Sequence, residues 1–180
     1  MTDTTTATGW TLTGGNNATT GGDLTVLAAG PVTTGATVTT GGSGKIDIGT
    51  TAGSVTLSNA VMAGGSGSIE LTAATSLAVD AVVSSTSGEI NALAKNGNTA
   101  LGANVTTTGN AFVQASGGIT QSAGTLAADG AVLTAGTTIG SSTNAVNTNV
   151  NTLAMVSASD AYDSNNKALT AAARTTSNGN

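Results

Sequence analysis

The sequence predicts an all-β protein, a right-handed parallel β-helix (β-solenoid) with three short strands in each rung. Three observations predict this fold: apolar-polar-apolar segments recur about every 20–23 residues, small turn residues separate them, and β-branched Thr and Val are abundant. One such rung cannot bury its few apolar side chains alone, whereas stacked rungs form parallel strands and align like residues in columns. We expect about seven rungs.

The first strand of each rung is marked by the pair GGSGKIDI at 41–48 and GGSGSIEL at 64–71. Its inward anchors are taken as Leu24, Ile46, Ile69, Ile90, Val113, Leu133 and Leu153. Side chains alternate along a strand, so the residues that follow the first four anchors should point outward. These outward residues are Thr25, Asp47, Glu70 and Asn91.

Two further apolar series supply the other strands of the rung. The series eight residues before an anchor is Val38, Val61, Val82 and Val105. The series after the anchor is Val32, Val55, Leu57, Leu77, Val79, Leu101, Ile119 and Ile139. Gly and Asn between the series suit the corners, and the right-handed sense follows from the handedness of parallel crossovers. An antiparallel sandwich or barrel, the alternative architecture, would demand neither a constant repeat length nor matching columns.

The two ends of the chain differ from its middle. Residues 1–20 are rich in Thr and are expected to form an N-terminal cap or a first rung, with Trp10 as a plug. Residues 21–155 carry the solenoid repeats. Residues 156–180 lose the repeat and form either a C-terminal cap, with helix-favouring residues 167–174 over the last rung, or a polar tail.

The composition excludes several classes of function. The chain has no Cys and no His, so disulfides, thiolate metal sites and Ser-His or Cys-His pairs cannot form. Its four scattered cations and three aromatic residues do not make a nucleic-acid surface, and its apolar runs are too short to insert into a membrane. We therefore expect no enzymatic activity, no cofactor and no metal.

Asp47 and Glu70 are the main candidates for chemistry, because one repeat separates them and they should lie side by side outside the coil. Their proximity should raise the pKa of one of them, as in glycosidase sites. However, Lys45 is the only cation near them in the sequence, and aromatic residues that could stack on sugar are missing. A solvated face is the expectation, and a glycan-binding or polysaccharide-cleaving site built on these two acids is the alternative.

Two further ligands, calcium and ice, are bound by solenoids with known repeat motifs, and the sequence departs from both motifs. Calcium-binding solenoid repeats need Asp where GGSGKIDI has Ile46, and Asp47 falls one position late; Ile69 departs in the same way. These glycines are therefore interpreted as turn residues. An ice-binding solenoid, a further alternative, needs Thr pairs on every rung. The pairs that flank the second series are Thr37/Thr39, Ala60/Met62, Ala81/Val83 and Asn104/Thr106, which form no such rank.

A family resemblance lies between residues 117 and 154, where GGITQ, AVLTA, IGSS and NTLA follow one another. This segment resembles the repeats of filamentous-haemagglutinin-like bacterial adhesins and related large exoproteins. The resemblance implies a β-helix, a secreted or cell-surface location and a role in adhesion or spacing, with no catalytic residues. The chain is very short for that family and shows no secretion domain. It is therefore expected to be a fragment, or a small subunit that gains length by assembly.

Together these observations predict a non-enzymatic extracellular or bacterial cell-surface β-solenoid, either an adhesin stalk segment or a fibre-forming subunit. Its expected partners are chains that pair with the end rungs, or the continuation of a longer β-helix, because a bare end rung exposes unpaired backbone groups. Host or surface glycans, held by many weak contacts along the rod, are the other expected partners. Phe112 is expected to point outward from its strand.

Overall fold

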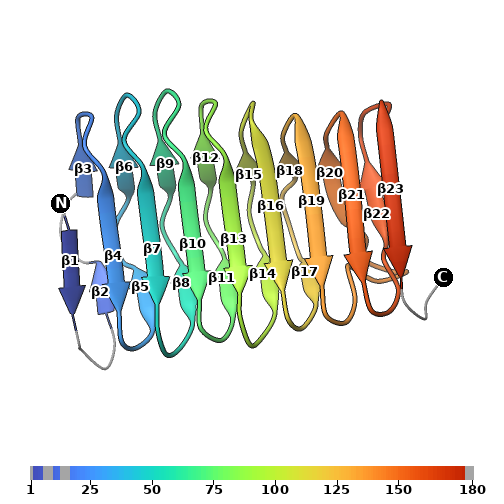
Figure 1. Cartoon of the computed structure of the whole chain (residues 1–180), viewed down its shortest axis with the longest axis horizontal. Helices are drawn as coiled ribbons and strands as arrows, with labels where there is room; N and C mark the ends of the chain where they lie inside the picture. Colours follow the sequence, from blue (N-terminus) through green and yellow to red (C-terminus); the bar gives the residue numbers. More distant parts are fainter. Residues whose placement is uncertain (1, 6–9, 13–16, 177–180) are drawn as a thin grey trace.

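The computed structural model describes residues 2–5, 10–12 and 17–176. Within these residues every regular element is a β-strand. The strands lie side by side along one long axis, and the two termini are at its opposite ends (Figure 1). The short local segments suit strands because buried residues two apart alternate with partly exposed ones. No helix that could span a bilayer occurs in these described stretches.

The largest sheet has nine strands and faces the viewer in Figure 1. In spatial order its strands are β1 (Thr2–Thr5), β4 (Leu24–Ala28), β7 (Ile46–Thr50), β10 (Ile69–Ala73), β13 (Ile90–Ala94), β16 (Asn110–Ala115), β19 (Gly130–Ala135), β21 (Thr152–Ser157) and β23 (Ala171–Thr176). We call it the nine-stranded sheet. It carries the longest strands of each turn, and its outer face holds the candidate site described below.

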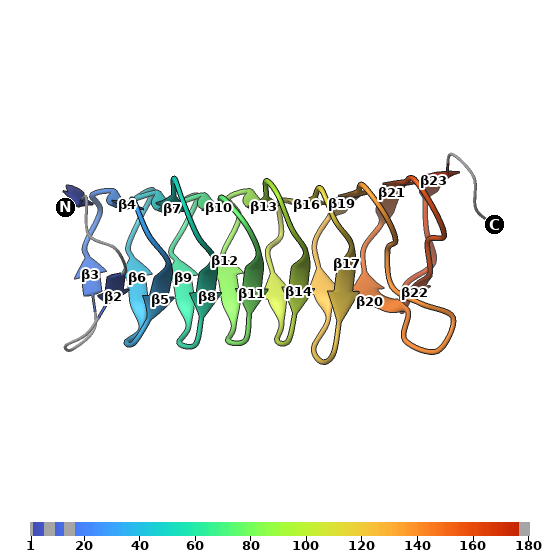
Figure 2. The same cartoon turned by 90° about the horizontal axis from the view of Figure 1, so that it is seen from below.

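Two smaller sheets close the coil, as the view from below shows (Figure 2). The six-stranded sheet consists of β2 (Trp10–Leu12), β5 (Val32–Thr34), β8 (Val55–Leu57), β11 (Leu77–Val79), β14 (Thr99–Leu101) and β17 (Ile119–Gln121). The eight-stranded sheet consists of β3 (Asn17–Thr19), β6 (Val38–Thr40), β9 (Val61–Ala63), β12 (Val83–Ser85), β15 (Val105–Thr106), β18 (Leu126–Ala127), β20 (Val146–Asn149) and β22 (Asp163–Asn165).

The pairing between neighbouring strands is parallel in all three sheets, and the chain visits the sheets in turn. This is the topology of a β-solenoid with three strands per turn. The smallest sheet has six strands, so about six turns carry all three, against the seven expected. Single parallel bridges at Ile139 and Ala161 extend that sheet toward the C-terminal end. The predicted all-β parallel solenoid is therefore confirmed.

The interior is built from columns of like residues, as the repeat predicted. Leu24, Ile46, Ile69 and Ile90 pair in register across four turns of the nine-stranded sheet, and each is almost fully buried. Burying one such side chain contributes about 1.5–3 kcal/mol relative to leaving it in water. A single turn holds only a few of these residues, so its stability depends on its neighbours.

Two of the predicted anchors are wrong by two residues. Ala111 and Ala131 continue the Ile90 column, while Val113 and Leu133 belong to the next inward column, which begins at Val26. Both columns face the core, because a shift of two residues preserves the face of a strand. Alanine is a weaker apolar signal than valine or leucine, so the sequence pattern favours the larger residues two positions later.

The second apolar series contains one error of a different kind. Val83, not Val82, pairs with Val61 and Val105; Val83 is fully buried and Val82 is 41% exposed. The connection from Val83 to Ile90 is one residue shorter than that from Val61 to Ile69, and a one-residue shift moves a side chain to the other face. The third series is confirmed, with Val32, Val55 and Leu77 in one column. Its remaining members Leu57, Val79, Leu101, Ile119 and Ile139 are also buried.

Glycine residues and hydroxyl-bearing side chains stabilise the corner that precedes the nine-stranded sheet. A Cβ placed on Gly67 would lie 2.2 Å from the backbone oxygen of Gly44 in the turn before, so only glycine allows this close approach. On the core side, the buried hydroxyl of Ser85 donates to Gly67 O at 2.7 Å, and that of Thr107 donates to Gly88 O at 2.6 Å. These bonds satisfy carbonyl groups that would otherwise be buried without a partner.

Both end segments contribute strands to the coil. The backbone of β1, β2 and β3 pairs with β4, β5 and β6, so residues within 1–20 run as a turn of the solenoid; the side chain of Trp10 lies outside the described residues. At the other end β21 crosses residue 155, and β22 and β23 add further strands. The helix considered for residues 167–174 is wrong, because β23 occupies its second half and pairs with β21. Edge pairing overrides the helix propensity of its alanines.

Candidate functional site

The outer face of the nine-stranded sheet carries the predicted outward residues. Thr25, Asp47, Glu70 and Asn91 pair in register, and each lies between two buried residues of its strand. Phe112 of β16 is the next member of this column. Residues that lie up to 87 positions apart in the sequence are thus brought onto one surface by the stacking of turns.

Asp47 and Glu70 are joined by Lys45, the cation that the sequence placed near them. The Lys45 ammonium lies 2.5 Å from a Glu70 carboxylate oxygen and 3.6 Å from an oxygen of Asp47. The hydrogen bond with Glu70 raises the pKa of Lys45. Burial raises the pKa of Asp47; Lys45 opposes this shift and Glu70 adds to it. One acid therefore has a raised pKa as predicted, but burial rather than the neighbouring acid is the main cause.

A shallow cavity lies on this face over β10, β13 and β16. It has a volume of about 290 Å³. Its lining residues are Glu70, Leu71, Thr72, Asn91, Ala92, Leu93, Phe112 and Gln114. The prediction that aromatic residues are missing beside Glu70 is wrong, since Phe112 lines the same cavity; Asp47 is not among the lining residues. Phe112 points outward as expected and is half-buried.

The arrangement of Glu70, Asn91 and Phe112 was not foreseen because of the anchor error. With Val113 as the anchor, Phe112 would stand opposite Glu89 rather than Asn91. The observed register pairs Asn91 with Phe112 and Leu93 with Gln114. Taking Ala111 as the anchor would have been enough to find this cluster from the sequence.

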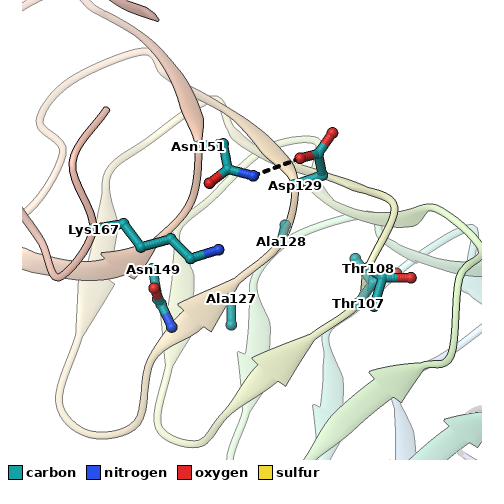
Figure 3. A pocket seen from close by; sticks show the side chains of 8 residues that line it. All are labelled: Thr107, Thr108, Ala127, Ala128, Asp129, Asn149, Asn151 and Lys167. Carbon is teal, nitrogen blue, oxygen red and sulfur yellow. Dashed lines mark hydrogen bonds between the residues drawn. The ribbon is translucent and has the colours of Figure 1, made fainter. Parts of the chain in front are cut away.

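A second hollow lies near the C-terminal end, beside β15, β18 and β20 (Figure 3). Its volume is about 220 Å³, and its lining residues are Thr107, Thr108, Ala127, Ala128, Asp129, Asn149, Asn151 and Lys167. Most of its polar groups already have partners. The Asn151 amide donates to Asp129 at 2.8 Å, and the hydroxyl of Thr108 donates to a backbone oxygen.

Polar side chains also point into the coil, at its C-terminal end. In β22, Asp163 pairs with buried Val146, and Asn165 pairs with buried Thr148. The Thr148 hydroxyl lies 2.8 Å from an Asp163 carboxylate oxygen and 2.9 Å from Asn165 Oδ1. Burial raises the pKa of Asp163, an effect that hydrogen bonds from Thr148 and from the Ser164 backbone N–H partly offset. The sequence pattern does not mark these residues, because they fall where the apolar repeat fades.

The structure shows where the residues of the motifs considered for calcium binding and for ice binding lie. Ile46 and Ile69, which stand where a calcium repeat needs a carboxylate, are fully buried, and the preceding Gly42 and Gly65 occupy positive-φ turns. No group of three or more acidic side chains gathers within the described ranges. In four neighbouring strands of the eight-stranded sheet, β6, β9, β12 and β15, the outward residues of this column are Thr39, Met62, Ser84 and Thr106. The pair that flanks Val83 is Val82 and Ser84, which corrects the Ala81/Val83 pair and still gives no rank of Thr.

The class of protein follows from this geometry: a β-solenoid repeat protein with three parallel sheets. Comparisons with protein-family models, with curated proteins and with solved structures gave no match. The function proposed below therefore rests on the fold, on the contacts of its surface and on the resemblance of residues 117–154.

Proposed function

We propose that this chain is a non-enzymatic structural β-solenoid of a bacterial surface or extracellular protein, serving as an adhesin stalk segment or a fibre-forming subunit. The observation that carries the proposal is the uninterrupted stack of parallel strands, nine deep in the largest sheet. Every turn is tied to the next by backbone hydrogen bonds and by buried columns such as Ile46, Ile69 and Ile90. A stack of this kind forms a stiff rod.

The filamentous-haemagglutinin-like resemblance supports the surface location. Residues 117–154, which carry it, form β17, β18, β19 and β20 and part of β21, so the resembling motifs belong to regular turns of the rod. The outward residues of the six-stranded sheet, such as Thr33, Thr56 and Thr120, are uncharged and are partly or fully exposed. A rod with such a surface suits spacing or presentation.

Self-association is proposed to run through edge strands. At the ends of the nine-stranded sheet, β1 and β23 each pair with one neighbour among the described strands. An edge strand offers backbone groups to another chain or to a further turn of a longer β-helix. In β22, by contrast, Asp163 and Asn165 stand at inward positions, and inward polar residues oppose the addition of another apolar turn.

Electron microscopy of the purified chain, combined with light scattering, tests the structural proposal. Uniform fibres are expected if the chain is a subunit, and short rods of one chain are expected if it is a stalk segment. Compact particles that are not rods would contradict both forms.

The enzymatic alternative is tested separately with Asp47 and Glu70. Polysaccharide cleavage by the wild type that is lost in Asp47→Asn and in Glu70→Gln would overturn the non-enzymatic proposal. The expected result is no turnover on any polysaccharide, because Lys45 neutralises Glu70 and the cavity does not reach Asp47.

A further inference from the structure

We propose that the cavity over β10, β13 and β16 binds a short stretch of an uncharged polysaccharide, with Phe112 as the platform and Asn91 and Gln114 as hydrogen-bonding groups. This inference rests on the proposed adhesive role for its biological purpose. The binding itself depends only on the residues of the cavity.

The first observation is the state of the two amides. Elsewhere on the coil, amide side chains bond the backbone of a neighbouring turn: half-buried Asn59 donates to Thr34 O and exposed Asn96 donates to Ala74 O, both at 2.9 Å. In the described part of the chain, neither the half-buried side chain of Asn91 nor the exposed side chain of Gln114 bonds another group; only the backbone oxygen of Gln114 accepts, from the Thr99 hydroxyl. Their donors and acceptors are thus free for a ligand, as are those of the Thr72 hydroxyl.

The second observation is the ring of Phe112. It is half-buried at an outward position on a surface otherwise made of small, polar and aliphatic residues. An aromatic face carries negative charge density, and the C–H bonds on one face of a pyranose ring are weakly positive, so the two surfaces attract. Leu93, also half-buried, lines the same cavity and adds apolar surface to it.

The third observation concerns shape. Glu70, Asn91 and Phe112 stand in one column on three neighbouring strands, and strands lie about 4.8 Å apart, so the column spans about 10 Å along the rod. That is the length of a disaccharide unit. A cavity of about 290 Å³ lies just below the usual range of about 300–1,000 Å³ for ligand sites, which fits a short stretch of a longer chain.

Charge identifies the ligand as neutral. The one charged group in the lining, Glu70, is paired with Lys45, and the remaining lining groups are amides, a hydroxyl, a ring and aliphatic side chains. An anionic glycan or a nucleic acid would find no unpaired cation in the lining. An extended peptide binds through backbone hydrogen bonds, and the backbone groups of the strands beneath the cavity are already hydrogen-bonded to one another.

The test is calorimetric titration of the full chain with hexamers of β-1,4-linked glucose, of β-1,4-linked mannose and of β-1,4-linked N-acetylglucosamine. We expect at least one hexamer to bind with a Kd of about 1 mM or tighter, since one shallow site makes few contacts. Phe112→Ala should weaken that binding at least tenfold, and Asn91→Ala or Gln114→Ala severalfold. Asn149→Ala, in the hollow of Figure 3, is the matched control and should leave it unchanged.

Two results would overturn this proposal: no binding of any hexamer to the wild type, or equal binding by the wild type and Phe112→Ala. Binding of an extended peptide in place of the hexamers would also overturn it. Thermal unfolding of each variant checks that the coil is intact, which is expected because all four substituted residues stand at outward positions. Electron microscopy of the same samples separates the two proposals, since rods that bind no glycan contradict this inference alone.

Discussion

The middle turns and the C-terminal turns of this solenoid are closed in different ways. From residue 46 to 105 the inward columns are mostly apolar, as in the pairing of Val61, Val83 and Val105. Their buried polar members are Thr50, Ser85 and Thr99. In the C-terminal turns the same column of the eight-stranded sheet runs from Leu126 to Thr148 and Asn165. Apolar stacking therefore gives way to polar contacts inside the coil.

The polar end is held by side-chain hydrogen bonds to backbone groups. Asn165 accepts from Val150 N at 3.0 Å and donates to Val150 O at 3.2 Å, so its amide acts as a substitute for a further strand. Thr148 is fully buried and lies within hydrogen-bonding distance of both Asn165 and Asp163. The two regions differ in what lies next to them. An apolar column is buried only where a turn packs on each side of it, whereas a turn near an end has backbone N–H and C=O groups that side chains must hydrogen-bond.

The largest effect should come from filling the space between middle turns. Gly67→Ala would set a Cβ 2.2 Å from Gly44 O, a backbone atom that cannot move without separating two turns. We expect a loss of about 3 kcal/mol in the free energy of unfolding. Chemical denaturation with two probes, far-ultraviolet circular dichroism and Trp10 fluorescence, measures this loss.

Two glycines serve as matched controls for this substitution. At Gly130, nearer the C-terminal end, a Cβ would meet side-chain oxygens of Thr152 and Asn110, which can rotate away, so the expected loss is about 1 kcal/mol. At Gly22 a Cβ would meet nothing within 4 Å, and the stability should change by less than about 0.5 kcal/mol. Equal losses at all three positions would show that the middle turns are no more tightly stacked than the ends.

The sequence was sufficient for the architecture because two periodicities coincide in it. The repeat of about 21 residues aligned Leu24, Ile46, Ile69 and Ile90, and the alternation within each strand assigned the outward residues. The neighbouring positions of Asp47 and Glu70 followed directly from these two rules.

Only part of the candidate site could be predicted from the sequence. A shift of two residues along a strand leaves the alternation of inward and outward residues unchanged, so the pattern does not distinguish the two registers. Taking Val113 in place of Ala111 kept the correct face but moved Phe112 away from Asn91, and this hid the cavity. Val82 and Val83 are equally apolar, so only the length of the following corner distinguishes them. Glycan binding, the lack of enzymatic activity and the surface location stay predictions.

An intermediate effect should come from the acid inside the C-terminal turn. Because burial raises the pKa of Asp163, the folded protein keeps this proton at a pH where the unfolded chain has released it. Stability from this group is therefore fully present below the ordinary carboxyl pKa and is lost as the pH rises through the raised value. A protonated Asp163 can donate to Thr148, which then donates to Asn165.

The measurement is the unfolding free energy of the wild type and of Asp163→Asn between pH 3 and pH 7. Relative to the variant, the wild type should lose stability as the pH rises. Asp80→Asn, at an exposed site, controls for the removal of one negative charge. A difference between the wild type and Asp163→Asn that does not change with pH would show that the inward acid is as well solvated as a surface one.

The smallest effect should come from polar contacts outside the coil. Lys45 bridges Glu70 and Asp47, but its side chain is 39% exposed, and exposed ion pairs contribute about 0–1 kcal/mol. Lys45→Met should therefore cost less than about 1 kcal/mol, and the cost should shrink as salt is added. It should also raise the pKa of Asp47 further, since Lys45 lowers it in the wild type.

Lys95→Met, at an exposed position with no ion pair within the described residues, is the control. A salt-independent loss as large as that of Gly67→Ala would mean that the outer face, and not the stacked interior, holds the middle turns together.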